Sequence, residues 1–419
     1  MTEKIKSITG MNDILPDEVK LWQKLESSAR CIFEAYGFEE IRTPIIEDTS
    51  LFSRGIGTET QVVQKEMYTF ADKGGDSVTM RPEGTAGVVR AYIEHALSAQ
   101  DEITKLYYMG SMFRYERPQK GRLRQFHQIG AELLGVDSPQ ADAEVVIIID
   151  RLAKAVGIRE FDVCVNSLGT LDERKPYLEK LVGYFRASED ALCVDCRNRL
   201  EKNPLRLFDC KNERCQGIGA QAPLLIDNLS EESKRHFGIF QEALTKAGVA
   251  FKVNPRIVRG LDYYEKTSFE FVSDRLGSQS AFGGGGRYNR LVEELGGKPT
   301  PGVGFGLGCE RMILLMQEFL GAEEKSDLHG VYFIGFNQAG LDKGRELMQF
   351  VRDLGVRAEA GYEPKSMKSQ MRRANKMGFR FAAIIGDDEL ASGTVALKNL
   401  SDGAQEAVAF AELAKKVAG

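Results

Sequence analysis

The stretch MFRYERPQKGRLRQFHQIGAE, residues 112–132, constrains the fold of this chain more than any other. It reads as a strand, a basic loop and a second strand. Successive side chains of a strand point to opposite faces. One face of the second strand therefore carries Phe126, Gln128, Gly130 and Glu132. We expect a hairpin with cations at its mouth and hydrogen-bonding groups on its floor, rather than a solvated hairpin with an ordinary charged tip.

Arginine and lysine side chains surround this hairpin. Arg114 and Glu116 fall on one side of the incoming strand, and the loop adds Arg117, Lys120, Arg122 and Arg124. Planar guanidinium groups suit phosphate because each can bind two oxygens at once. Arg259, before a predicted strand, and Arg311, at the start of a predicted helix, are separate candidates for phosphate contacts.

The usual phosphate-binding loops are missing from the sequence. It contains no G-x-x-x-x-G-K-[ST], and the glycine-rich strand at 302–308 does not match G-x-G-x-x-G before a helix. We therefore expect an antiparallel sheet whose arginines hold phosphate directly. Glycine at every second position of 302–308 leaves one strand face bare, which lets another group or the following helix approach closely.

The order of predicted elements indicates an α+β fold in two domains. Residues 1–325 would form the larger domain, with a helical, cysteine-containing insertion at about 169–250. Residues 326–419 would form a small α/β domain, which includes a predicted helix near 406–417. Beside another helix of this domain lie Lys365, Lys368, Arg372, Arg373 and Lys376. This local charge opposes the overall acidity and favours an anionic partner over a plain solvated face.

The net charge of -5 argues against a protein that coats nucleic acid indiscriminately, although it allows a local basic patch. No run approaches the ~18 apolar residues of a membrane span, and the first residues lack the apolar core of a secretion signal. We expect a cytoplasmic protein with no membrane partner. Its seven cysteines are then thiols or metal ligands rather than disulfides.

Four of these cysteines form the pattern C-x2-C-x13-C-x4-C, at Cys193, Cys196, Cys210 and Cys215. The spacing is close to that of a zinc ribbon but does not match the commonest form. Two readings stay open, a structural Zn²⁺ ion or unpaired thiols in a reducing compartment.

Several separate motifs resemble those of the histidyl-tRNA synthetases, class II aminoacyl-tRNA synthetases of the bacterial type. FEEIRTPIIE at 38–47 resembles motif 1, residues 112–132 resemble motif 2, and GVGFGLGCERM at 302–312 resembles motif 3. RGLDYY at 259–264 and AFGGGGRYN at 281–289 resemble the two histidine-specific motifs, which other class II members lack. The resemblance spans nearly the whole chain.

The resemblance implies ATP-dependent charging of tRNA(His) with L-histidine, through histidyl-adenylate. It assigns catalysis to Arg259 and Arg114, with Arg114 at the α-phosphate and Arg311 at the distal phosphates. Phe126 would stack on adenine near Glu116, and Mg²⁺ would bridge the remaining phosphate charge.

The resemblance also implies a closed histidine pocket. Its members would be Glu83, Gly84, Thr85, Gln128, Glu132, Tyr263, Tyr264 and Tyr288. Glu132 and Tyr264 would hydrogen-bond the imidazole, and a site built to pair a polar side chain rejects analogues lacking it by roughly 10⁴ to 10⁵. From its sequence position alone, Glu83 fits a turn and helix cap equally well.

Three kinds of partner follow from the resemblance: tRNA(His), a second copy of the chain, and the small substrates L-histidine and ATP. The loop residues Arg117, Gln119, Lys120 and Arg122 would meet the tRNA acceptor end. The C-terminal domain would bind the anticodon, and motif 1 implies a homodimer.

Two other readings must be weighed. Regulatory subunits of histidine biosynthesis use the same fold to bind histidine without charging tRNA, but generally lack the C-terminal module and the arginine motif. Prolyl or threonyl synthetases share the C-terminal module but not RGLDYY. The intact RGLDYY motif and the residues after Gly330 favour the histidine enzyme.

Overall fold

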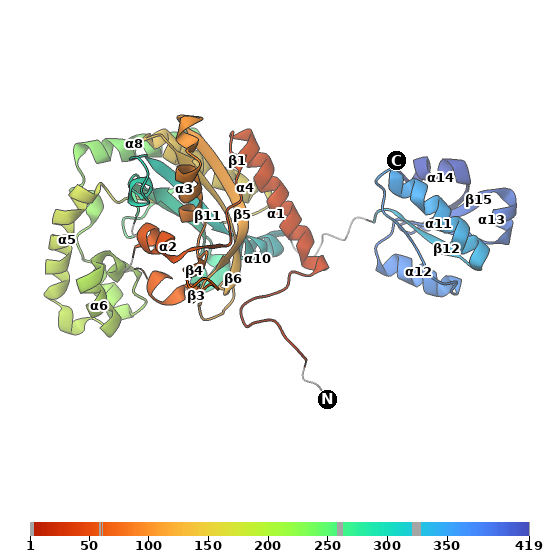
Figure 1. Cartoon of the computed structure of the whole chain (residues 1–419), viewed down its shortest axis with the longest axis horizontal. Helices are drawn as coiled ribbons and strands as arrows, with labels where there is room; N and C mark the ends of the chain where they lie inside the picture. The colour runs from red at the N-terminus through yellow and green to blue at the C-terminus, as the bar shows by residue number, and fades with distance from the viewer. Residues whose placement is uncertain (1–3, 58–59, 61, 258–262, 321–327, 419) are drawn as a thin grey trace. The chain divides into compact units, whose positions relative to one another are not determined.

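The computed structural model describes residues 4–57, 60, 62–257, 263–320 and 328–418. The chain divides into two compact units, Met1–Leu320 and Gly321–Gly419 (Figure 1). The domain boundary expected between residues 325 and 326 falls outside the described residues and stays a prediction. In the part of the chain that is described, no helix has both the length and the apolar character needed to cross a membrane.

An eight-stranded sheet organises the first unit. Its strands are β1 Glu39–Glu40, β5 Thr104–Phe113, β6 Gln125–Leu134, β7 Asp162–Ser167, β8 Lys252–Val253, β9 Glu265–Val272, β10 Ala281–Arg287 and β11 Gly302–Gly308. They lie in the order β1-β5-β6-β11-β10-β9-β7-β8. Every pair is antiparallel except β1 with β5 and β7 with β8. The predicted α+β class with an antiparallel sheet is confirmed.

Strands β5 and β6 form the hairpin expected from the sequence, and they pair over ten residues. One detail of that prediction is wrong. β5 ends at Phe113, so Arg114 and Glu116 lie in the loop and not on the strand. The N–H of Arg114 still bonds to the Arg124 carbonyl at 2.9 Å. Beyond it, the N–H of Glu116 bonds to the Arg114 carbonyl at 2.8 Å, which turns the chain, and Pro118 has no N–H to donate.

Helices cover the apolar face of this sheet. They are α1 Pro16–Ala35, α4 Pro139–Ala155, α8 Glu231–Lys246 and α10 Cys309–Leu320. Their buried side chains share one core with Ile129, Ala131 and Leu133 of β6, the face predicted to be apolar. The polar face of β6 is thereby left for the functional groups.

A small second sheet brings the start of one helix against the polar face. Its order is β2-β4-β3, with β2 Ile46–Asp48, β3 Tyr68–Ala71 and β4 Ser77–Met80. Arg81 ties it to β5 by donating to the carbonyls of Thr43 and Ser111, each at 2.9 Å. The chain then enters helix α3 at Thr85. The neighbouring elements are α2 Thr49–Ile56, α3 Thr85–Glu94, α9 Leu291–Glu294, the π-helix η1 Val62–Glu66 and the 3-10 turns η2 Leu97–Ala99 and η6 Asp274–Gln279.

A helical segment between β7 and β8 has a core of its own. It contains α5 Leu171–Arg186, η3 Glu189–Ala191, α6 Val194–Lys202, η4 Pro204–Asp209, α7 Glu213–Gly219 and η5 Leu225–Asn228. In Figure 1, α5 and α6 lie at the edge of the unit, beyond the sheet. Their core includes Tyr264 and Tyr288, whereas α8 packs into the main core through Phe237, Phe240 and Leu244. The insertion bounds of about 169–250 stay a prediction.

The second unit is a five-stranded sheet with helices, in the order β13-β12-β14-β15-β16. Its elements are β12 Val331–Gly335, α11 Gln338–Asp353, β13 Ala358–Ala360, α12 Met367–Lys376, β14 Phe381–Ile385, α13 Asp387–Ser392, β15 Thr394–Asn399, β16 Gln405–Ala409 and α14 Phe410–Ala418. The predicted helix at 406–417 is wrong in its first turn. A tight turn with Gly403 at φ +80° returns the chain to pair with β15, and only Val408 of β16 is buried.

Candidate active site

A cavity of about 240 Å³ opens at the mouth of the β5–β6 hairpin. Its walls come from the hairpin loop, from β6, from the glycines of β10 and β11, and from α10. All four residues predicted to bind ATP line it: Arg114, Glu116, Phe126 and Arg311. The structure therefore brings together residues that lie almost 200 positions apart in the sequence.

Arginine side chains give this cavity a cationic wall. Arg114 donates from Nε to the Pro82 carbonyl at 2.9 Å, and Arg311 donates from Nε to the Gly121 carbonyl at 2.8 Å. Burial lowers the pKa of Arg311, and the nearby charges of Arg122 and Arg114 add to that effect. Guanidinium groups crowded in this way favour a polyanion between them.

Phe126 and Glu116 both line the cavity. The Arg114 guanidinium carbon stands 5.2 Å from the centre of the Phe126 ring, so the ring already stacks on a flat cation. The Glu116 carboxylate pairs with Arg122. Arg122, expected to reach tRNA from the loop, thus lines this cavity as well.

Further along the polar face of β6, the Glu132 carboxylate is fully buried. One of its oxygens accepts a hydrogen bond from the Thr85 hydroxyl at 2.7 Å, and the other accepts one from the Tyr288 hydroxyl. Burial raises the pKa of Glu132 to about 8, against the lowering effect of these two hydroxyls. A carboxyl group with such a pKa is typical of a functional site.

Glu83 lies in the same buried region and does cap a helix. Its carboxylate accepts from the N–H groups of Thr85 at 2.7 Å and Ala86 at 2.8 Å, in the first turn of α3. Burial nevertheless raises its pKa. The turn-and-cap reading is therefore confirmed, and the same residue lies within the candidate pocket, next to Gly84 and Thr85.

Three tyrosines predicted from the histidine-specific motifs pack together in this region, and one of them, Tyr288, contacts Glu132. The ring centre of Tyr263 lies 4.6 Å from that of Tyr264 and 5.7 Å from that of Tyr288. Arg174 of α5 donates to the Tyr264 carbonyl at 2.6 Å, which ties the helical insertion to the pocket wall.

The bare face of β11 makes room for these groups. A Cβ at Gly302 would collide with the Tyr288 ring, and one at Gly304 would collide with the Glu132 carboxylate. At Gly306 the nearest atom would be Nε2 of Gln128 at 3.4 Å. The alternate glycines thus make room for two side chains of β6 and for Tyr288, which directly follows β10, as the sequence pattern indicated.

Sequence reasoning missed Tyr108, a buried residue of β5. Burial raises its pKa well above the ordinary value, and the charges of Glu132 and Glu83 raise it further. A Cβ at Gly84 or Gly130 would collide with its ring. Alternation along residues 104–113 would have placed Tyr108 on the polar face. That Tyr108 lies opposite Gly130 depends on the register between β5 and β6, which the sequence does not give.

The remaining loop residues predicted to contact tRNA are exposed. Arg117, Gln119 and Lys120 follow β5, and the backbones of Gln119 and Arg122 bond to each other at 2.9 and 3.0 Å in a tight turn. Gln119 and Lys120 line a separate cavity of about 400 Å³ beside α1 and α10. Arg259, predicted to be catalytic, lies outside the described residues.

The four cysteines of the predicted metal site converge. Cys193 and Cys196 belong to the start of α6, Cys210 follows η4, and Cys215 lies on α7. Their four sulfur atoms all lie within 4.8 Å of one another, and the thiols are free. The N–H of Cys193 donates to the sulfur of Cys215 at 3.3 Å. Such a set of sulfur ligands suits Zn²⁺.

The second unit carries a basic cavity of about 370 Å³ beside α12. Its lining includes the predicted cations Lys365, Arg372, Arg373 and Lys376, together with the aromatic residues Tyr332 and Tyr362. Tyr362 is 91% exposed, so its ring is open to stacking by a partner. Cations mixed with an exposed aromatic ring are typical of nucleic-acid binding.

Comparisons with known proteins agree with this geometry. A family described as histidyl-tRNA synthetase matches residues 10–173 and 220–312, and one described as anticodon binding domain matches 330–419. The unmatched residues 174–219 contain the four converging cysteines.

Curated relatives extend the match to nearly the whole chain. The histidine--tRNA ligase of Syntrophotalea carbinolica is 48% identical, covering 97% of this chain and 96% of its own length. That of Trichlorobacter lovleyi is 50% identical and covers 96% of each chain. The crystal structure of the apo histidyl-tRNA synthetase from S. aureus superposes with a TM-score of 0.84, at 35% identity, covering 99% of this chain and 100% of the other. The chain belongs to the histidyl-tRNA synthetase family.

Proposed function

We propose that this protein is a histidine–tRNA ligase, which charges tRNA(His) with L-histidine at the expense of ATP. One observation carries the proposal: a cavity walled by arginines and a buried cluster of polar side chains around Glu132 lie on one face of β6. Gln128, between them on that face, lines the cavity. This arrangement would place the phosphates of ATP next to the bound histidine. A cytoplasmic location is part of the proposal.

In the first step, a carboxylate oxygen of histidine attacks the α-phosphorus of ATP. The bond from that phosphorus to the bridging oxygen breaks, and pyrophosphate leaves with the electron pair. Arg114 and Arg259 would stabilise the charge that builds on the α-phosphate, an electrostatic role on the order of 10² to 10³ in rate. Arg311 would hold the distal phosphates, and bound Mg²⁺ would neutralise part of their charge.

The adenine base would stack on Phe126 near Glu116. In the structure the Arg114 guanidinium carbon lies 5.2 Å from the centre of this ring, so the ring already packs against a flat group.

Histidine would occupy the pocket around Glu132. Glu83, Thr85 and Gln128 would hold its amino group, while Glu132 and Tyr264 would pair with the imidazole between Tyr263 and Tyr288. The support is that Glu132 is buried and already accepts hydrogen bonds from Thr85 and Tyr288. An imidazole N–H would donate to the same carboxylate, either in place of one of these hydroxyls or in addition to them. A pocket that hydrogen-bonds the imidazole would reject amino acids that lack these polar groups, so a separate editing site would be unnecessary.

In the second step, a hydroxyl oxygen of the terminal tRNA ribose attacks the histidyl carbonyl carbon, and AMP leaves. The loop residues Arg117, Gln119, Lys120 and Arg122 would position the acceptor end. The basic cavity beside α12 would meet the anticodon, in keeping with the family match of residues 330–419.

Histidine-dependent exchange between ATP and pyrophosphate tests the first step, and charging of a tRNA(His) transcript tests the second. We expect both with the wild-type protein and a loss of exchange in Arg259→Ala. Histidine binding without any exchange would contradict the ligase and support a regulatory subunit instead. Unimpaired exchange in Arg259→Ala would contradict only the role of that residue.

The active form is proposed to be a homodimer. Motif 1 presents two exposed apolar neighbours, Ile45 and Ile46, each 46% exposed. Burial of such a pair in a subunit interface would remove them from water. Sedimentation at micromolar concentration should give a dimer, and a monomer under the conditions of the exchange assay would contradict the proposal.

The four-cysteine cluster is proposed to hold a structural Zn²⁺. The Cys193 and Cys210 sulfurs lie 3.8 Å apart, which matches the edge of a tetrahedron with Zn–S bonds of about 2.3 Å. Cys210 also accepts from the N–H of Asn212 at 3.4 Å, and such backbone bonds favour a thiolate. Elemental analysis should find one zinc per chain, and its absence after growth in zinc would contradict the site.

A further inference from the structure

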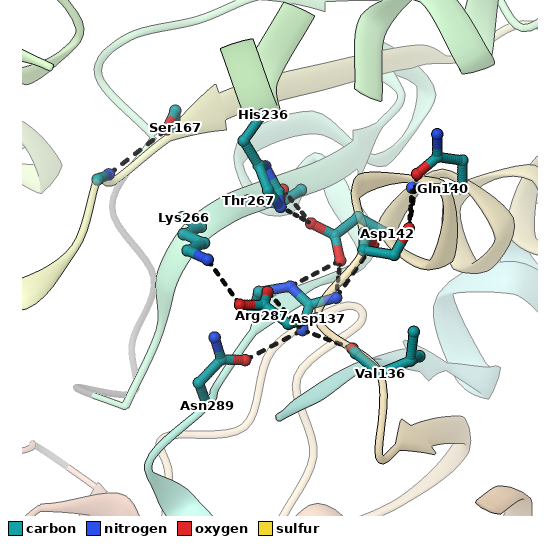
Figure 2. Close-up of polar contacts among 12 residues, drawn as sticks. Val136, Asp137, Gln140, Asp142, Ser167, His236, Lys266, Thr267, Arg287 and Asn289 are labelled. Atoms are coloured by element: carbon teal, nitrogen blue, oxygen red, sulfur yellow. Dashed lines mark hydrogen bonds and ion pairs between the residues drawn. The ribbon is translucent and has the colours of Figure 1, made fainter. Parts of the chain in front are cut away.

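A buried ion pair lies next to the candidate histidine pocket, at the residue that directly precedes Tyr288. Arg287 ends β10 and Asp142 lies in the first turn of α4, and both side chains are fully buried. Their contact uses Nε and one terminal nitrogen of the guanidinium, at 2.9 and 2.5 Å from the same carboxylate oxygen. Figure 2 shows the arginine enclosed by its partners.

Every N–H of this guanidinium has an acceptor. Besides Asp142, it donates to the carbonyl of Val136 at 3.0 Å, the side-chain oxygen of Asn289 at 3.0 Å and the carbonyl of Ser138 at 3.2 Å. Five N–H groups thus make five hydrogen bonds, the full capacity of an arginine. An arginine saturated in this way is fixed in one orientation, together with the backbone on either side of it.

The second oxygen of Asp142 reaches a different strand. It accepts a hydrogen bond from the Thr267 hydroxyl of β9, and it lies 3.6 Å from Nε2 of His236 on α8. Figure 2 shows Thr267 and His236 on that side of the carboxylate, away from the arginine. One carboxylate therefore joins the ends of β9 and β10 to the start of α4.

The pairing of β9 with β10 is irregular at the same place. Gly286 pairs with Ser268, whereas the next residue, Arg287, pairs with Glu265, so β9 carries a bulge at Lys266 and Thr267. Lys266 has φ +47°, a strained value for a residue other than glycine, and its ammonium group bonds to Asp137 at 2.9 Å. Bulges bend a strand and redirect its side chains, and strain of this kind gathers at functional sites.

The bulge and the ion pair flank two pocket residues. Tyr264 lies directly before β9, three positions before Thr267, and Tyr288 directly follows Arg287. The Tyr288 N–H bonds to the Gly302 carbonyl at 2.8 Å, and its hydroxyl reaches Glu132. We propose that Arg287 and Asp142, with Thr267, are positioning residues that hold Tyr288 and Tyr264 in the geometry that recognises histidine.

A purely structural role is the competing explanation, because a buried ion pair is costly to break wherever it lies. The two explanations differ in what they predict for the substrates. If Tyr288 loses its position, KM for histidine changes and KM for ATP does not, since the arginine-walled cavity is built from other residues. General destabilisation lowers the fraction of folded enzyme, which reduces the maximal rate and leaves KM for both substrates unchanged.

The test measures KM for histidine and for ATP in the exchange assay, with Asp142→Asn and Thr267→Val. We expect KM for histidine to rise on the order of 10-fold or more, with KM for ATP changed less than about 2-fold. Asp150→Asn is the matched control, because Asp150 is equally buried on α4 but pairs with Arg151 and Lys154 of the same helix. It should leave KM for histidine unchanged.

A double-mutant cycle with Tyr288→Phe identifies the route of the effect. If Asp142 acts through Tyr288, Asp142→Asn should raise KM for histidine little further in the Tyr288→Phe background. Should Asp142→Asn fail to fold, Thr267→Val carries the same cycle, because it removes one hydroxyl and keeps the charges paired. Equal changes in both KM values, or an unchanged KM for histidine, would overturn the proposal.

This inference rests on the proposed function, and the assay separates the two. Absence of histidine-dependent exchange in the wild-type protein would contradict the function. Normal exchange in the wild-type protein, with unaltered histidine KM in folded Asp142→Asn and Thr267→Val, would contradict only the positioning role.

Discussion

The carboxylate of Glu132 accepts a hydrogen bond from the hydroxyl of Tyr288, a residue 156 positions further along the chain. Both side chains are buried, and each is directed onto the bare glycine face of β11. Burial raises the pKa of Glu132 to about 8. The candidate pocket is thus built around an acid whose charge changes close to neutral pH.

Glu132→Gln should alter how stability depends on pH. Because the native pKa of about 8 lies above the ordinary value of 4.5, the folded protein binds more protons than the unfolded chain between these values. This contribution to stability is complete below pH 4.5 and is lost as pH rises to about 8. The wild-type free energy of unfolding should therefore fall relative to that of the glutamine variant across this window.

Urea unfolding of both proteins without histidine, at several pH values from about 5 to 9, measures that difference. Since all other titrating groups are shared, their effects cancel in the comparison. Parallel stability curves for the two proteins would show that Glu132 does not titrate in this range.

Gly304→Ala should destabilise the first unit. The new Cβ would meet the Glu132 carboxylate and, at 2.6 Å, the carbonyl oxygen of Ala131, which is backbone and cannot turn away. Overpacking of this kind costs about 1–3 kcal/mol of unfolding free energy. Gly306→Ala is the control on the same strand face, where the nearest atom is 3.4 Å away on the flexible Gln128. A loss in Gly306→Ala as large as that in Gly304→Ala would contradict the steric explanation.

The local pattern of β6 predicted much of the candidate site. Alternation alone placed Gln128 and Glu132 on one face, and the structure has them there. The side chains of any strand alternate between two faces, whichever strands lie beside it. The close approach of other groups to the glycines of β11 could also be predicted, since each glycine leaves a gap that a neighbouring side chain fills. The resemblance to a family supplied the roles of these residues.

Contacts between distant strands could not be predicted from such patterns. Tyr108 enters the pocket because β5 pairs with β6 in one register, and Asp142 meets Arg287 across 145 positions of the chain. The same limit explains the error at residues 406–409, where pairing with β15 decides the conformation and the residues themselves show no strong preference.

Arg311→Lys should weaken ATP binding while keeping the positive charge. The arginine is held by the Gly121 and Ala281 carbonyls, so its fork points in a fixed direction that a lysine cannot reproduce. Loss of one charged hydrogen bond corresponds to about 10- to 100-fold in KM for ATP, with KM for histidine nearly unchanged.

Arg275→Lys is the matched control for this substitution. Arg275 also contacts α10, through Glu318 at 3.1 Å, but it is half exposed and its other partner is Glu160, remote from the cavity lining. Both KM values should stay at the wild-type level. An equal rise in KM for ATP in both variants would point to α10 as a whole and not to the guanidinium of Arg311.

Cys196→Ser should lower thermal stability and zinc content together. Cys196 is fully buried within the four-sulfur cluster, and a hydroxyl there is a much poorer zinc ligand than a thiolate. The insertion between β7 and β8 has a separate core in which Cys196, Cys210 and Cys215 are buried. Loss of the metal should therefore loosen α6 and α7 before the main sheet unfolds, which hydrogen exchange of these helices would record.

Cys309→Ser separates loss of metal from loss of a buried thiol. Cys309 is buried in the main core and lies outside the cluster, so its variant should lose stability but keep zinc. A chelator should then lower the Tm of the wild-type protein and of Cys309→Ser, and leave that of Cys196→Ser unchanged, because that variant has no metal to lose. A chelator effect of the same size in all three proteins would place the sensitivity elsewhere in the chain.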